Sequence, residues 1–317
     1  MENRFTILLP TRPQPDTLVA IFLLKTFGKE KFAGVRDAEV AIRHQLAEGE
    51  TFESLLARNI LALDLGGGPL DHHGKNECTS ELVARYLGIE KDPALQAMLS
   101  YARRDDKEGK GTISKDSIDR AFGLSGLVGS LNKMYTSDPQ KIVDAVMPLL
   151  AAQYHSSREH HVELPQEVER KRADGAFEKR DVRQENRTLS VAFVVSDKPS
   201  MPSYLRSTAG GHMDVVVQKS EQTNHYCILS RQERKVDLSK VAALIRLREG
   251  ELRGKDLGND AEELGKNSRH DDVPMWYVDP ATNSILNGGP HNRSVEESKI
   301  PWDEMKKIVA LGLEMGK

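Results

Sequence analysis

The sequence LDLGGGPLDHH, residues 63–73, decides the prediction of both the fold and the site. Asp64 lies near the end of the apolar run 60–65, and the glycines at 66–68 let the backbone turn sharply. An aspartate and two histidines follow at 71–73. Imidazole and carboxylate groups together suit Mn²⁺, Zn²⁺ or Fe²⁺. The stretch therefore predicts a metal site, and a plain turn capped by its own aspartate is the alternative.

Upstream of this stretch, strand-like and helix-like segments alternate. Short apolar runs predict strands and longer ones with helical start signals predict helices, in the order strand 5–9, helix 18–27, strand 38–43, helix 53–58 and strand 60–65. This alternation is typical of a parallel sheet covered by helices. Ligands bind beyond the carboxyl ends of such strands. Asp16 and Asp64 both follow a predicted strand, so we expect them at one edge of the sheet.

Downstream, the chain reads as helical as far as residue 175. The predicted helices cover 80–87, 93–104, 115–122, 126–135 and 139–175, the last interrupted near its prolines at 148 and 165. The charged segment 176–188 is predicted to be a linker. A smaller α/β domain is expected over 189–317. Its predicted elements are strands 189–195, 214–218 and 226–229, helix 237–252, loop 253–272, hairpin 276–278 with 284–286, and helix 302–315.

Composition excludes several classes of protein. The 317 residues carry 45 basic and 48 acidic side chains, so net charge gives no sign of nucleic-acid binding. Mean hydropathy is −0.52, and no run approaches the roughly 18–20 apolar residues of a membrane helix. The apolar run at 5–9 is too short for a signal peptide, which favours a cytoplasmic protein without membrane contact. Cys78 and Cys227 are expected to be reduced structural thiols, and a homodimer is left open.

The run from Asp64 to His73, followed by CTSELVARYLG at 78–88, resembles the DHH phosphoesterases. This family includes RecJ exonuclease, the NrnA oligoribonucleases and the manganese-dependent inorganic pyrophosphatases, and the likeness is nearest to the Myg-type exonucleases. It covers roughly residues 5–110 and weakens beyond them. In the second domain it rests on Gly210-Gly211-His212, which resembles a family substrate loop. The resemblance implies a parallel-sheet DHH core with a helical connection and a smaller C-terminal domain.

The resemblance also implies two divalent ions, Mn²⁺ or Mg²⁺, held by four motifs. Asp64 matches the second motif and His72 the third, while Asp105 and Asp106 fit the fourth equally well. In the first motif, Asp16 matches one aspartate. The family's histidine and second aspartate are replaced, by Arg12 and Leu18 respectively.

These replacements leave each ion one protein ligand short. An arginine at this place repels a cation but suits a phosphate. Three interpretations stay open: an active enzyme with a rearranged site, a catalytically degenerate binder, or replacement ligands elsewhere. His155, His160 and His161 are candidates for such ligands, although a solvated helix face fits their spacing better.

The resemblance also implies roles for the two residues beside His72. Asp71 is expected to orient a histidine beside it, and His73 to lie near the leaving group. Residues expected to bind substrate are Arg12, Arg206, His212, Gly288, Gly289 and Arg293, the last three in a loop rich in backbone donors that also fits a plain hairpin end. The predicted function is a metal-dependent phosphoesterase that hydrolyses short nucleic acid or nucleotide phosphodiesters. The alternative is a degenerate DHH-fold protein that binds a nucleotide, a nucleic acid or a partner protein.

Overall fold

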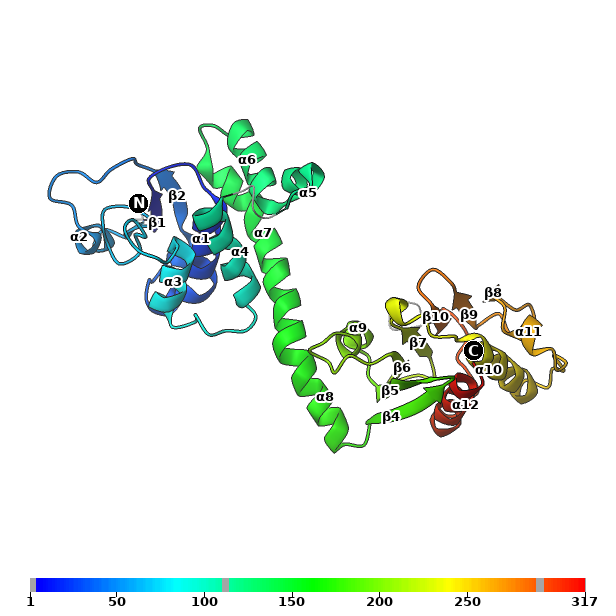
Figure 1. Ribbon diagram of the computed structural model, residues 1–317. Helices are drawn as coiled ribbons and strands as arrows, with labels where there is room; N and C mark the ends of the chain where they lie inside the picture. Colours follow the sequence, from blue (N-terminus) through cyan, green and yellow to red (C-terminus); the bar gives the residue numbers. More distant parts are fainter. Residues whose placement is uncertain (1–3, 110–113, 289–293, 317) are drawn as a thin grey trace. The chain divides into compact units, whose positions relative to one another are not determined.

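The computed structural model describes residues 4–109, 114–288 and 294–316 (Figure 1). The chain is a mixed α/β protein, as the sequence predicted, and it divides into two compact units. The first unit ends at Val162 and the second begins at Glu163, so the division comes before the predicted boundary at residue 175. Within the described residues, no helix combines the length and the apolar character needed to cross a bilayer.

The described strands of the first unit form a three-stranded parallel sheet in the order β2-β1-β3. The strands are β1 (Thr6–Leu9), β2 (Glu39–Ile42) and β3 (Ile60–Ala62). Thr6 of the central strand pairs with Glu39 on one side and with Ile60 on the other. The chain therefore crosses first to one side of β1 and then to the other. The order therefore reverses between β1 and β3, and ligands of such sheets bind at the carboxyl ends of the strands beside this point.

Helix α1 (Pro15–Phe27) forms the centre of the first unit. Pro15 occupies an opening position where its missing N–H costs nothing. Its residues from Pro15 to Leu24 are all buried, because α1 packs against α3, α4, α6 and α7. Ile7 and Leu9 join this core, whereas Leu8 faces a small cluster on the other side of the sheet. The other helices are α2 (Phe52–Leu56), α3 (Thr79–Leu87), α4 (Gln96–Glu108), α5 (Ser117–Phe122), α6 (Leu124–Met134) and α7 (Pro139–Arg158), with 3₁₀ turns Gly28–Glu30 and Val35–Asp37.

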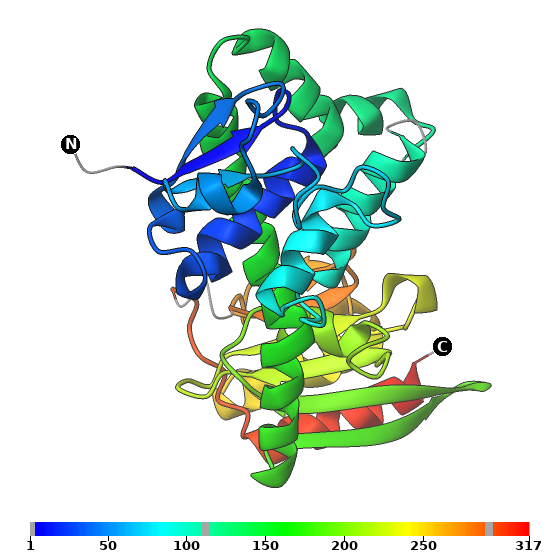
Figure 2. The same ribbon diagram turned by 90° about the vertical axis from the view of Figure 1, so that its left-hand side faces the viewer.

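The second unit is built on a mixed sheet, of which seven strands are described, in the order β4-β5-β6-β7-β10-β9-β8. The strands are β4 (Phe177–Gln184), β5 (Arg187–Val195), β6 (Val215–Lys219), β7 (Tyr226–Ser230), β8 (Ser268–Arg269), β9 (Tyr277–Asp279) and β10 (Ser284–Asn287). Side chains of β5 alternate between two cores: Val191 and Phe193 face one, Ala192 and Val194 the other. The helices are α8 (Leu164–Ala173), α9 (Met201–Arg206), α10 (Ser239–Leu252), α11 (Ala261–Leu264) and α12 (Trp302–Met315), with a 3₁₀ turn Gln232–Arg234. Figure 2 shows α12 lying along β4.

The predicted linker at 176–188 is wrong. This segment forms β4 and the start of β5, paired from Phe177 with Val194 to Gln184 with Arg187. The strand was not predicted because its sequence is mostly charged. Charge is tolerated there because β4 lies at the edge of the sheet and only Val182 and Gln184 are buried. Edge strands commonly carry charge, which discourages pairing with other chains.

Other predicted boundaries also shift. Pro148 lies inside α7 without ending it, whereas a π-helical turn, Glu159–Glu163, comes just before Pro165. The predicted loop 253–272 contains α11 and the two residues of β8, and helix α9 was not predicted. The hairpin of β9 with β10 is confirmed.

Candidate metal centre

Asp64 stands at the end of a tightly built loop. Strand β3 stops at Ala62, before the predicted end at residue 65, because Asp64 adopts a left-handed backbone with φ +58°. The Asp64 N–H donates to the Leu70 carbonyl at 3.0 Å and closes the turn. Gly66 has φ +81°, and a Cβ there would lie 2.3 Å from Leu46 Cδ1. The loop therefore requires glycine at position 66.

The side chain of Asp64 is nearly buried, with 14% of its surface exposed. Burial raises the pKa of this carboxyl group above its ordinary value. Its Oδ1 lies 2.7 Å from His72 Nδ1 and 3.5 Å from His73 Nδ1. Neither contact has hydrogen-bond geometry, and Oδ1 accepts no hydrogen bond from any described residue. A buried carboxylate oxygen with free lone pairs beside imidazoles is what a divalent cation needs.

Asp16, a predicted metal ligand, also has a structural role. It is buried, and its Oδ2 accepts the Thr79 N–H at 2.9 Å. Its Oδ1 accepts the Ser80 N–H at 2.9 Å and the Ser80 hydroxyl at 2.6 Å. Asp16 therefore caps the amino end of α3, where a negative charge is favourable. The cap ties the start of α1 to the helix that follows the Asp-His-His stretch.

His72 lies close to Asp106, one of the two candidates for the fourth motif. Its Nε2 lies 3.7 Å from Asp106 Oδ2, close to the roughly 3–3.5 Å that separates neighbouring ligands of one ion at ordinary bond lengths. Asp16, His72 and Asp106 each offer an atom within 4.8 Å of the others. Asp106 therefore joins the centre through His72. Asp105 is buried on the same helix, and its Oδ1 accepts no hydrogen bond from a described residue.

A second group is formed by Asp64, Asp71 and His73, whose ligand atoms also lie within 4.8 Å of one another. Asp64 contacts both groups, because its Oδ1 lies close to His72 and to His73. Asp16 and His72 thus belong to one group, together with Asp106. The donor set of carboxylates, imidazoles and two unbonded buried oxygens fits a divalent ion.

Asp71 and His73 form a hydrogen-bonded pair beside this centre. Asp71 Oδ2 accepts the Gly67 N–H at 2.7 Å, while Oδ1 accepts the His73 N–H at 3.0 Å and lies 2.7 Å from His73 Nδ1. Burial alone would raise the pKa of Asp71, but these hydrogen bonds outweigh it and the pKa is lowered. The hydrogen bond to Asp71 raises the pKa of His73. The pair favours an ionised aspartate and a protonated, exposed imidazole.

The two replaced positions of the first motif have other contacts. Leu18 is fully buried in the core around α1. Arg12 is exposed, and its Nη1 donates to the Asn132 carbonyl of α6 at 3.2 Å. Among the described residues, the two groups of candidate ligands include none of His155, His160 and His161.

In the second unit, the residues predicted to bind substrate have different surroundings. The Arg206 guanidinium is half-buried and donates to the Pro202 and Ser230 carbonyls at 3.2 and 2.8 Å. His212 is exposed, in a left-handed backbone with φ +58°. Gly288 follows β10 with φ +66°, while Gly289 and Arg293 lie outside the described residues.

Sequence reasoning missed Thr79 and Ser80. Both are fully buried at the start of α3, and both contact centre residues. Two hydroxyl residues opening a helix soon after Asp-His-His were the available signal. The two cysteines are free, as predicted, and burial raises the pKa of each thiol to about 12.

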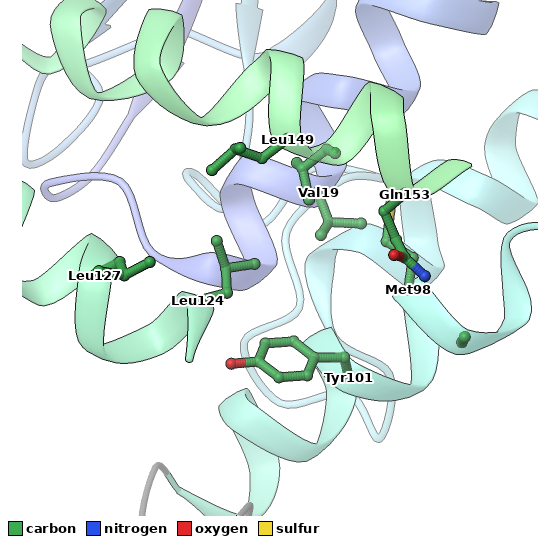
Figure 3. A pocket seen from close by; sticks show the side chains of 9 residues that line it. Val19, Met98, Tyr101, Leu124, Leu127, Leu149 and Gln153 are labelled. Atoms are coloured by element: carbon green, nitrogen blue, oxygen red, sulfur yellow. The ribbon is translucent and has the colours of Figure 1, made fainter. Parts of the chain in front are cut away.

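A separate cavity in the first unit is apolar, with a volume of about 460 Å³. Figure 3 shows its lining, which combines Val19 of α1, Met98 and Tyr101 of α4, and leucines of α6 and α7. None of the predicted site residues lines it.

Comparisons of the chain with models of protein families, with curated proteins and with solved structures found no match. The DHH resemblance therefore rests on the residues of this chain.

Proposed function

We propose that the first unit is a DHH-type core and that the protein is a metal-dependent phosphoesterase acting on short nucleic acid or on a nucleotide. The single observation that carries the proposal is Asp64 Oδ1, a buried oxygen without a hydrogen bond that faces two imidazoles. Structural carboxylates are normally satisfied by donors. An unsatisfied one at the switch point of a parallel sheet is best explained by a cation or substrate.

Asp16, Asp64, His72 and Asp106 would hold the ion, with the buried Asp105 on the same helix as Asp106. The donor set suits Mn²⁺, with Mg²⁺ as the second choice. A bound ion would supply positive charge to phosphoryl oxygens. Loss of the family's histidine and second aspartate leaves these four side chains as the ligands on which the proposal depends.

The pair of Asp71 with His73 would supply the proton that the leaving oxygen needs. Asp71 holds the His73 ring through Nδ1, so Nε2 of the exposed imidazolium is free to donate. Asp71 keeps the positive charge in place and orients the ring. These are the roles of a general acid and of the residue that positions it.

Hydrolysis of a short 5′-labelled RNA in Mn²⁺ tests this function. We expect cleavage by the wild-type chain, none after chelation, and none with Asp64→Asn. Asn keeps the shape and tolerates the left-handed backbone at this position. Asp303→Asn is the matched control, since it removes the same charge from a side chain that is 83% exposed. Cleavage that survives chelation or the Asp64 substitution would reject the proposal.

The second candidate function is a degenerate DHH-fold protein that binds a nucleotide, a nucleic acid or a partner. The observation that favours it is Leu18, an apolar core residue where the family carries an aspartate. This candidate predicts neither Mn²⁺ retention nor cleavage, together with saturable binding of a labelled nucleotide or RNA.

A further inference from the structure

One ring nitrogen of His72 has two oxygens within reach. Its Nδ1 lies 2.7 Å from the Thr79 hydroxyl and 2.7 Å from Asp64 Oδ1. The Nδ1–Thr79 contact has hydrogen-bond geometry, whereas Asp64 Oδ1 accepts no hydrogen bond from a described residue. A neutral imidazole carries one proton, so a proton on Nδ1 can serve only one of these acceptors well.

Thr79 is held firmly in the place from which it contacts His72. Its side chain is fully buried, and it is the first residue of α3. Its backbone N–H donates to Asp16 Oδ2 at 2.9 Å. Asp16 thus fixes the helix end that carries the hydroxyl, without contacting that hydroxyl itself.

We infer that Thr79 is a positioning residue that directs the Nδ1 proton of His72 away from Asp64 Oδ1. By accepting the Nδ1 proton, its hydroxyl leaves Asp64 Oδ1 free. It also fixes the tautomer in which Nε2 has its lone pair, on the side where Asp106 Oδ2 lies at 3.7 Å. Without the hydroxyl, Nδ1–H donates to Asp64 Oδ1 and occupies an oxygen that a cation needs. The inference rests on the proposed metal centre and adds a residue to it.

The test compares Thr79→Val with Thr79→Ser by calorimetric titration with Mn²⁺ alone. Valine keeps the branched shape but removes the hydroxyl, and serine keeps the hydroxyl. We expect valine to weaken Mn²⁺ binding about 10- to 100-fold, as loss of an outer partner of a metal-bound histidine does. Serine is expected to stay close to wild type. Equal affinities of the valine variant and wild type, or equal losses in both variants, would overturn the inference.

A second measurement uses the wild-type chain and does not depend on a variant that folds. Nitrogen-15 NMR of the ion-free protein reports which ring nitrogen of neutral His72 carries the proton, with His72→Gln to assign the signal. We expect the proton on Nδ1, and a proton on Nε2 would overturn the inference. Failure of wild type to bind Mn²⁺ would reject the proposed function together with this role. Normal wild-type binding with an unaffected valine variant would reject the role alone.

Discussion

A fully buried and a nearly buried carboxylate, one in each unit, have opposite hydrogen-bonding surroundings. Glu249 of α10 is fully buried and receives four hydrogen bonds, from Trp276 Nε1 at 3.0 Å, Ser298 Oγ at 2.7 Å, Lys299 N at 3.0 Å and Arg253 Nε at 2.8 Å. Asp64 of the first unit is nearly buried, yet its Oδ1 receives none from the described residues. Burial alone therefore does not distinguish a structural acid from a functional one.

The difference lies in where the balancing positive charge and donors come from. Glu249 is neutralised by Arg253 and joins three separate segments of the second unit. Desolvation of such a group is offset inside the fold. At Asp64 no hydrogen bond to Oδ1 from the described residues offsets the desolvation, and burial raises the pKa of the carboxyl group. A site that binds a cation would offset the cost only when the ion arrives.

The largest predicted effect is at Glu249. Glu249→Ala should lower the free energy of unfolding by about 3 kcal/mol, because Trp276 Nε1 and the Ser298 hydroxyl lose their acceptor inside the core. Both tryptophans of the chain belong to the second unit, so urea unfolding followed by tryptophan fluorescence reports on it. Mn²⁺ affinity should not change, and a loss of Mn²⁺ binding would break the contrast with Asp64.

Asp16 is expected to show both kinds of effect. Asp16→Ala removes the acceptor of two N–H groups at the start of α3, which should cost about 2 kcal/mol of stability. It should also weaken Mn²⁺ binding, because a candidate ligand is lost. Circular dichroism during urea unfolding in EDTA measures the first effect and titration the second. If stability falls while Mn²⁺ affinity is unchanged, Asp16 is a helix cap and not a ligand.

The smallest predicted effect is at Asp64, and it has the opposite sign to that at Glu249. A carboxyl group with a raised pKa in the folded state destabilises that state once it ionises. The penalty is absent below the unfolded pKa of about 3.9, grows as pH rises through the folded pKa, and is then fully present. In EDTA, Asp64→Asn should therefore raise the urea midpoint at pH 7 and have little effect near pH 4. A lower midpoint at pH 7 would mean that Asp64 is structural.

Local sequence signals were sufficient to predict which edge of the parallel sheet carries the candidate site. Asp16 and Asp64 each follow an apolar strand, and parallel pairing of β1 with β3 brings the two strand ends together. The sequence could not distinguish Asp105 from Asp106, because neighbouring helical residues point about 100° apart and packing of α4 sets their directions. Asp106 is the one that falls in a candidate ligand group among the described residues.

Other features depended on tertiary contacts that no local pattern records. In the sequence, Thr79 looks like an ordinary first residue of a helix. Its contacts with Asp16 and His72 join separate parts of the chain and appear only in the structure. Strand β4 has the composition of a linker and becomes a strand because β5 pairs with it along its length.

The most direct test of the metal centre is calorimetric titration of the ion-free wild-type chain and of Asp64→Asn with Mn²⁺ under the same conditions. The structure predicts saturable binding to wild type and a loss in Asp64→Asn larger than the roughly 10- to 100-fold cost of removing an outer partner. Absence of binding to wild type, or equal binding by the two proteins, would contradict the assignment of Asp64 as the central ligand.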